Sequence, residues 1–221
     1  MSFARHPFDP TFEELPDVIP IFPLGGVLLL PRGRLPLNVF ELRYLNMIRD
    51  SMANQRVIGM IQPDAQHEED DIVPLFRTGC AGRITSFSET PDGRYLVTLR
   101  GICRFHLMEE LPQVNGYRRV VPDWKPFCRD LQKDDGSVNR ERLRSEIKRY
   151  FTAKNISADW EAIEATPDEQ LVTSLSMICP FAPSEKQALL EVSDLAERAQ
   201  LIMGLMEMSA LEPYGGDGPL N

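Results

Sequence analysis

The side chains most able to do covalent chemistry in this chain are its histidines and cysteines. Three histidines occur, at His6, His67 and His106, and Cys103 precedes the last of them by three residues. A Cys–His nucleophile needs both groups within hydrogen-bond reach and a third group that orients the base. Successive side chains of a strand point to opposite faces, so positions 103 and 106 of a predicted strand face away from each other. The spacing therefore argues against a catalytic pair, and we expect no catalytic residue.

The acidic run from Glu68 to Asp71 is the other group that could do chemistry, because its carboxylates could supply oxygen ligands to a cation. The run lies in PDAQHEEDD, residues 63–71, which lacks the D-x-D-x-D-G spacing and the helical flanks of a calcium loop. The segment predicts a solvated polar loop. We expect neither a metal site nor a cofactor.

The signatures of nucleotide hydrolysis and of serine hydrolases are missing from these 221 residues. Neither G-x-x-x-x-G-K-[ST] nor G-x-S-x-G occurs. The four cysteines, Cys80, Cys103, Cys128 and Cys179, are scattered and form no C-x-x-C pair, so zinc and redox motifs have no local support. They predict free thiols, buried or partly buried, in a reducing compartment. The chain is therefore predicted not to be an enzyme.

The charge and hydrophobic content of the sequence argue against nucleic acids and membranes as partners. The formal net charge is −9, which repels phosphate backbones, and the densest basic stretch, residues 140–148, is interrupted by Glu141 and Glu146. We expect no nucleic-acid partner. No apolar run approaches the roughly 20 residues that cross a bilayer, and the first 17 residues lack the apolar core of a secretory signal. The sequence predicts a cytoplasmic protein without a membrane partner.

One stretch, Ile19 to Met52, is expected to organise the fold. Its apolar runs IPIF (19–22) and VLLL (27–30) are bounded by Pro and Gly and predict two buried strands, and Leu35 to Val39 predicts a third, with Pro36 typical of an edge strand or a strand start. From Glu41 the apolar period becomes helical, with Leu42, Leu45, Ile48 and Met52 on one face. Strands that fold back and then lead into a helix predict a small β-barrel.

More strands follow. Residues 56–62 form an apolar run that predicts a strand buried on both faces. Residues 76–87 and 95–99 alternate around Thr90-Pro91-Asp92-Gly93, which predicts a hairpin with Val97 and Leu99 on one face and Leu96, Thr98 and Arg100 on the other. Gly101 predicts a bulge, Ile102 to Leu107 continues the sheet, and Tyr117 to Val121 is a last strand ended by Pro122.

Beyond a predicted hinge at residues 124–136, the pattern is helical. Leu143, Ile147 and Phe151 share one face, and Ser157 is expected to cap a short helix. Capping boxes are predicted at residues 166–169 and 184–187. Ser193 is expected to cap a final helix that buries Leu195, Ala199, Ile202 and Met206.

Three separated blocks of this sequence resemble a known family. IPIFPLGGVLLLP and LPLNVFELRYLNMI resemble the start of the Lon protease amino-terminal domain, and the phrase FELRY (40–44) is similar to stand-alone bacterial members that have no ATPase attached. Residues 79–105 resemble the family's G-x-x-x-x-I…PDG…G-x-x-R-F hairpin. Residues 182–206 resemble its closing helices, with K-Q-x-L-L-E (186–191) as the most specific phrase. The resemblance runs from about Leu15 to Leu211.

The resemblance implies an α+β fold in which an N-terminal PUA-like β-barrel or pseudobarrel precedes a C-terminal helical bundle. We expect a barrel subdomain with one long helix at residues 15–123, a helical subdomain at 137–211, and flexible termini at 1–14 and 212–221. It also implies a non-enzymatic module that recognises other proteins, through exposed or unfolded segments or as an adaptor. The alternative is nucleic-acid or small-ligand binding through the barrel, which rests on fold analogy alone.

Four residues are candidates for a protein-binding surface. Arg43 and Asn46 are expected on the exposed face of the first helix, while Glu41, Phe40 and Tyr44 are expected to serve the helix start and its packing. Met203 and Met208 are expected in an exposed patch of the last helix, because Met-rich surfaces rebind varied apolar partners, whereas Met206 is expected in the core.

Overall fold

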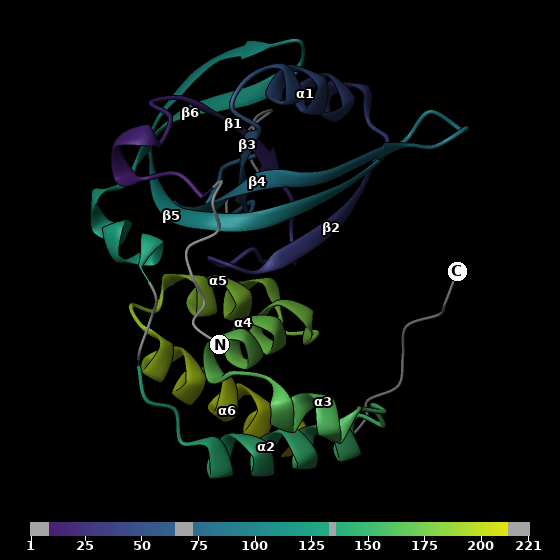
Figure 1. Cartoon of the computed structure of the whole chain (residues 1–221), viewed down its shortest axis with the longest axis vertical. Helices are drawn as coiled ribbons and strands as arrows, with labels where there is room; N and C mark the ends of the chain where they lie inside the picture. The colour runs from purple at the N-terminus through teal and green to yellow at the C-terminus, as the bar shows by residue number, and fades with distance from the viewer. Residues whose placement is uncertain (1–8, 65–72, 133–135, 212–221) are drawn as a thin grey trace.

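The computed structural model describes residues 9–64, 73–132 and 136–211, and it places a β layer above a layer of helices (Figure 1). The β layer holds η1 (Phe12–Glu14), β1 (Ile19–Pro23), β2 (Arg34–Val39), α1 (Leu42–Ala53), β3 (Val57–Ile61), β4 (Thr78–Glu89), β5 (Tyr95–Val114), β6 (Tyr117–Asp123) and η3 (Lys125–Leu131). The helical layer holds α2 (Arg140–Ala153), α3 (Trp160–Ala165), α4 (Asp168–Ile178), α5 (Pro183–Glu191) and α6 (Leu195–Leu211). The expected α+β class, with a β part followed by helices, is confirmed.

The sheet closes on itself through β5. Its strand order is β2-β5-β4-β3-β1-β6, and β6 also pairs with the second half of β5. β2 lies outside this ring and pairs only with β5 among the described strands, so Pro36 occupies an edge, as its missing N–H predicts. β5 can serve three neighbours because it is 20 residues long and bends at a bulge. The register places Ala81 opposite Cys103 and Gly82 opposite Gly101, which leaves Ile102 as the extra residue and confirms the bulge.

The predicted faces of the β4–β5 hairpin are also confirmed, because Val97 and Leu99 are buried whereas Leu96 is exposed. One expectation at the end of the sheet is wrong. β6 continues through Pro122, which pairs with Leu107, and ends at Asp123.

Helix α1 lies across one end of the sheet and forms part of the connection between the parallel strands β1 and β3. Tyr44 packs it onto the sheet, with its ring stacked on Phe22 at a centroid distance of 4.1 Å. The expected packing roles of Phe40 and Leu42 are wrong, because these side chains are 65% and 72% exposed. The buried side chains of α1 include Tyr44, Met47 and Ile48, which lie on one side of the helix.

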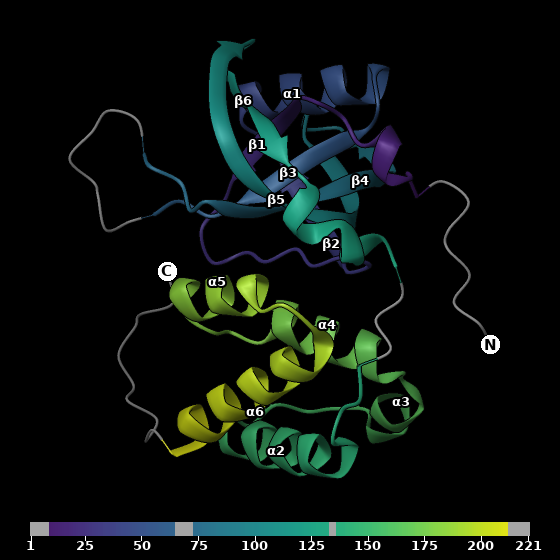
Figure 2. The same cartoon turned by 90° about the vertical axis from the view of Figure 1, so that its left-hand side faces the viewer.

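The predicted strand at 27–30 is a buried loop. Leu28, Leu29 and Leu30 are at most 2% exposed, yet this part of the chain joins no ladder. Residues 24–33 run between the strands and helix α5 (Figure 2). The side chains of Leu28, Leu29 and Leu30 belong to the core that joins both layers. A short apolar run indicates that a segment is buried, but it does not distinguish a strand from an enclosed loop.

The helices bury the stripes that their periodicity predicts. Leu143, Ile147 and Phe151 of α2 are buried, as is the predicted stripe of α6. The helix starts differ from those predicted. Asp159 rather than Ser157 accepts from the third helical N–H of α3, and Thr166 bonds back to Ala162 of that helix instead of capping α4.

The last two helices begin near the predicted capping residues, but the hydrogen bonds at their starts involve other residues. Helix α5 begins at Pro183, and the N–H of Ala182 before it donates to Glu185 at 2.7 Å. At the start of α6, Asp194 accepts from the N–H of Glu197 at 2.9 Å, and the hydroxyl of Ser193 donates to the Glu197 side chain. Several adjacent polar residues could accept from the first N–H groups of a helix. The direction in which the chain enters the helix, set by Pro and by the preceding turn, decides which of them does so.

One large core joins the two layers. It combines side chains of the sheet and α1, the three leucines of the 27–30 loop, and side chains of α2, α4, α5 and α6. A smaller core lies on the other side of the sheet, around Phe105, Ile19 and Trp124. The predicted subdomain limits at 15–123 and 137–211 stay a prediction. The expected arm at 1–14 is described from Asp9 onward, and the tail 212–221 lies outside the described residues.

None of the helices in the described ranges combines the length and the apolar character that crossing a bilayer requires.

Candidate binding cleft between the sheet and the helices

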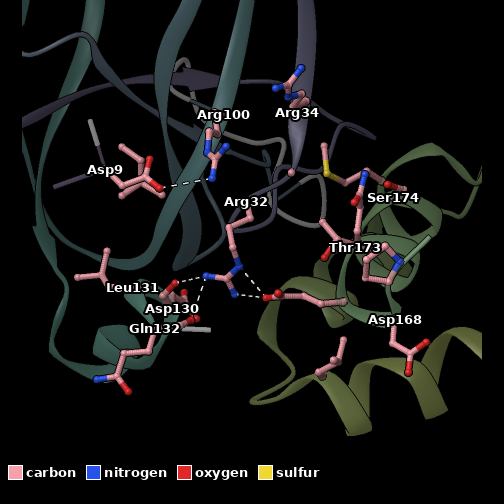
Figure 3. Close-up of a pocket in the computed structure, with 18 of the residues that line it drawn as sticks. Asp9, Arg32, Arg34, Arg100, Asp130, Leu131, Gln132, Asp168, Thr173 and Ser174 are labelled. Atoms are coloured by element: carbon pink, nitrogen blue, oxygen red, sulfur yellow. Dashed lines mark hydrogen bonds and ion pairs between the residues drawn. The ribbon is translucent and has the colours of Figure 1, made fainter. Parts of the chain in front are cut away.

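A cleft of about 660 Å³ opens where the start of β2 and the bend of β5 face helix α4 (Figure 3). Its walls come from both layers: Arg34 and Arg100 from the sheet, Met177 and Ile178 from α4, and Asp9 from the segment before η1. Ile178 is 70% exposed at this position, which is unusual for an isoleucine at the end of a helix that packs in the core. The cleft thus combines charged and apolar walls.

Arg32 connects the two sides of the cleft. Its backbone is left-handed (φ 64°), which turns the side chain out of the buried loop toward α4. The guanidinium forms an ion pair with Glu169 of α4 and donates to the backbone oxygens of Asp130 at 2.6 Å and Gln132 at 3.1 Å. A charged group with four directed contacts fixes the distance between the layers at this point.

Two glycines allow the close approach that builds the cleft. At Gly101 an added Cβ would lie 2.0 Å from the backbone oxygen of Leu30, and this residue also exchanges hydrogen bonds with Arg32 and Gly33. At Gly33 an added Cβ would lie 2.4 Å from the sulfur of Met177. A side chain at Gly101 would push the loop away from β5, whereas at Gly33 the flexible Met177 side chain would have to move.

Every carboxylate that lines the cleft is paired with an arginine. Asp9 pairs with Arg100, Asp130 with Arg104, Asp168 with Arg140, and Glu169 with Arg32. Each of these acidic side chains is thus held by an ion pair at the wall of the cleft.

Arg104 and Asp130 connect the layers behind the cleft. Their side chains are 5% and 8% exposed and form a bidentate ion pair, with Nε–Oδ2 at 2.9 Å and Nη2–Oδ1 at 2.8 Å. The remaining donors of Arg104 reach the backbone oxygens of Leu190 at the end of α5 and of Val192 and Ser193 in the α5–α6 turn. One strand residue therefore fixes both η3 and the end of α5.

A second polar junction lies at the start of α5. Lys186 donates to the backbone oxygens of Gly26 at 2.9 Å and Met177 at 3.2 Å, and burial lowers the pKa of this amine. Gln187 donates to the backbone oxygen of Thr78 at 3.2 Å and accepts from Gln62 at 3.1 Å. Buried amides that use both their donor and acceptor atoms fix one relative placement of the two layers.

The comparisons with known proteins agree with this architecture. The family model described as the ATP-dependent protease La (LON) substrate-binding domain matches residues 18–208. The chain belongs to this family. The matched module is the substrate-binding one and is non-catalytic.

Relatives and solved structures extend this result. Lon protease 2 of Myxococcus xanthus is 26% identical over 198 residues, which cover 88% of this chain and 24% of the relative. Lon protease of Parabacteroides distasonis is 30% identical over 216 residues, which cover 90% of this chain and 25% of the relative. The chain thus spans about a quarter of the length of these curated relatives.

Two solved structures share the fold. The crystal structure of a Lon N-terminal domain protein from Xanthomonas campestris aligns with a TM-score of 0.58 at 23% identity, over 85% of this chain and 97% of the other. The N-terminal domain of the Mycobacterium avium complex Lon protease aligns with a TM-score of 0.59 at 14% identity, over 86% and 98%.

The sequence phrases that carry the resemblance lie at the junctions of the layers. K-Q-x-L-L-E supplies Lys186 and Gln187 to the second junction, and its two leucines enter the core. G-x-x-R-F supplies Gly101 at the bulge, Arg104 in the buried ion pair and Phe105 in the smaller core. The residues that carry the resemblance therefore set the relative placement of the sheet and the helices.

The first two predicted site residues lie at the far end of the sheet from the cleft. Arg43 is 54% exposed, pairs with Glu41 and lies over the ring of Tyr44. Asn46 is half-buried and donates to the backbone oxygen of Asn115 at 3.1 Å, which ties α1 to the β5–β6 turn. Asn46 thus has a structural contact, and a binding role for either residue stays a prediction.

Of the two methionines predicted to form an exposed patch, only Met208 is exposed. Met206 is buried as expected, but Met203 is 3% exposed, so its expected exposure is wrong. Helix α6 packs against several neighbours and therefore buries a wider face than a single stripe predicts. Met208 is 57% exposed, and both views place its helix in the lower layer, away from Arg43 on α1. The structure does not bring the four predicted residues together.

Cys103 and His106 contact different groups in the structure. The thiol of Cys103 is buried and donates to the backbone oxygens of Arg104 and Phe127, and burial raises its pKa. His106 packs edge-on against Phe127, and burial together with Arg77 lowers its pKa. All four cysteines are free, with Cys128 exposed.

Nowhere in the described ranges do three His, Cys, Asp or Glu side chains group closely enough to hold a metal ion. His6, His67 and the run from Glu68 to Asp71 lie outside those ranges.

Sequence reasoning missed the cleft because its walls come from distant parts of the chain. The alternation of β5 did place Arg100 on the face opposite the core. No pattern indicated that Arg34, Arg100 and Ile178 would share one cavity, since this depends on how the 24–33 loop lies between the layers.

Proposed function

We propose that this chain is a protein-recognition module that binds exposed or unfolded segments of other polypeptides, acting in the cytoplasm on substrates or as an adaptor. The observation that carries the proposal is the cleft itself, a cavity of about 660 Å³ between the layers with an exposed isoleucine at its rim. Family membership supports a protein as the ligand.

The mechanism is reversible binding in an open, partly apolar cleft. An extended segment can place an apolar side chain against Ile178 and Met177, while its backbone can form hydrogen bonds with polar groups of the cleft. Contacts of this kind depend on the ligand being unfolded, because a folded protein keeps such side chains in its own core. The module needs no chemistry of its own.

A direct test compares one labelled protein in its folded form and in a permanently unfolded form. We expect the module to bind the unfolded form and not the folded form. Ile178→Glu should weaken this binding, because it places a charge where an apolar side chain packs. Met208→Glu is the matched control on α6, away from the cleft. Equal binding of both forms would contradict the proposal, and selective loss in the Met208 variant would move the site to α6.

A further inference from the structure

Three arginines form a row across the sheet next to the cleft. Arg34 of β2 lies directly opposite Arg100 of β5, and Arg100 lies opposite Arg83 of β4. Directly opposed residues share one face, with Cβ atoms about 4.5–5.5 Å apart, and like charges in such positions repel each other. The fold therefore concentrates positive charge at one place in a chain whose net charge is −9.

Part of this positive charge remains available at the cleft. Arg34 is exposed, and none of the side chains that the structure describes forms an ion pair with it. The Nε of Arg100 is buried without a hydrogen-bond acceptor among the described groups. The other acidic side chains of the cleft are held by Arg32, Arg104 and Arg140 and do not neutralise the row.

The chain itself shows which chemistry the row accepts. Asp9 lies in the irregular, extended segment before η1, and its carboxylate reaches the guanidinium of Arg100 with an oxygen–nitrogen distance of 3.4 Å (Figure 3). This distance is long for a charge-assisted contact, which is normally 2.7–2.9 Å. A carboxylate on an extended segment thus already lies on Arg100.

We propose that the cleft binds extended polypeptides through an acidic side chain, whose carboxylate replaces Asp9 on Arg100 and also contacts Arg34. An apolar residue near the acidic one packs against Ile178 and Met177 on the opposite wall. The proposal rests on the proposed function and specifies its ligand: an unfolded segment in which acidic and apolar residues adjoin. Asp9 acts as an internal competitor that any ligand must displace.

A carboxylate fits this place better than a polyanion such as RNA. The row is short, and the chain as a whole carries a net charge of −9, which disfavours a strand of phosphates. A single carboxylate needs only the two arginines. Since the contact is electrostatic, added salt should weaken it.

The test uses two labelled short peptides, acetylated and amidated at their ends, in which glutamate alternates with leucine and serine, or glutamine replaces every glutamate. Fluorescence anisotropy with the full chain should show the glutamate peptide binding roughly tenfold more tightly. Arg34→Gln and Arg100→Gln should remove this preference, and Asp9→Asn should strengthen binding of the glutamate peptide. Arg144→Gln on α2 is the matched control, because its side chain is exposed and pairs with Glu164 outside the cleft.

Each outcome decides between specific possibilities. Equal binding of both peptides, still sensitive to Ile178→Glu, would overturn the carboxylate site and leave the proposed function standing. Absence of binding by either peptide and by the unfolded protein would overturn the proposed function. A labelled RNA strand that binds more tightly than the glutamate peptide, with loss in Arg34→Gln, would assign the row to phosphates instead. Circular dichroism of the Arg100 variant separates loss of binding from loss of folding.

Discussion

The guanidinium of Arg104 and the carboxylate of Asp130 form a bidentate ion pair that is almost completely buried, where β5, η3 and the α5–α6 turn meet. Burying two charges is costly, and the pair is stable here because Asp130 also accepts the N–H of Arg104 at 2.9 Å and the remaining arginine donors reach backbone oxygens. Removing one partner leaves the other charge buried and alone.

We therefore expect Asp130→Ala to lower the free energy of unfolding by about 3–5 kcal/mol, measured by urea denaturation. Glu164→Ala is the control, since its ion pair with Arg144 is exposed and should contribute at most about 1 kcal/mol. Similar small losses in both variants would show that the buried pair does not stabilise the junction.

The bend of β5 gives a second prediction. Gly101→Ala would place a Cβ 2.0 Å from the backbone oxygen of Leu30, so the loop that floors the cleft must shift. We expect a loss of about 3 kcal/mol or more in the free energy of unfolding.

Gly204→Ala is expected to stabilise the protein, in contrast to Gly101→Ala. Gly204 lies inside α6, and an added Cβ would meet nothing within 4 Å. Alanine there should raise the unfolding free energy by about 0.5–1 kcal/mol, because it restricts the unfolded chain. Thermal denaturation of both variants checks the contrast, and a stable Gly101 variant would mean that the loop yields easily.

The amide pair Gln62–Gln187 predicts energetic coupling between the layers. Gln62→Met or Gln187→Met alone leaves backbone groups around Gly26 and Thr78 without their partners and should cost about 1–3 kcal/mol. The double variant should cost less than the sum, with a coupling energy of about 0.5–3 kcal/mol from denaturation of the four proteins. Additive losses would show that the two amides act separately.

Tyr117 gives a prediction for alkaline pH. Burial, together with its hydrogen bond to Asp50 at 2.9 Å, raises the pKa of this phenol from 10.0 to about 12. The folded pKa exceeds the unfolded one, so the associated stability is fully present below pH 10 and is lost as the pH rises toward 12.

Tyrosinate absorbance should accordingly show Tyr117 ionising late together with Tyr150, whose pKa burial also raises to about 12, and the late absorbance change should fall by one group in Tyr117→Phe. Asp50→Asn should bring the ionisation of Tyr117 to lower pH, because the neighbouring negative charge is removed. A titration curve identical in wild type and Tyr117→Phe would rule out the assignment.

Several elements of the fold could be predicted from local sequence patterns. Alternation and the Pro-Asp-Gly turn predicted the β4–β5 hairpin and its faces, Gly101 predicted the bulge, and the helical period predicted the buried stripes of α2 and α6. These features depend on residues close in the chain, whose spacing alone sets which side chains share a face.

Other features depend on how distant segments of the chain pack together. The apolar run at 27–30 became an enclosed loop and Met203 became buried, because burial depends on which layer lies over a segment. The cleft brings Arg34, Arg100 and Ile178 together from positions far apart in the chain. Their proximity follows from the closure of the sheet and from the buried polar contacts between the layers, and neither is visible in a local pattern.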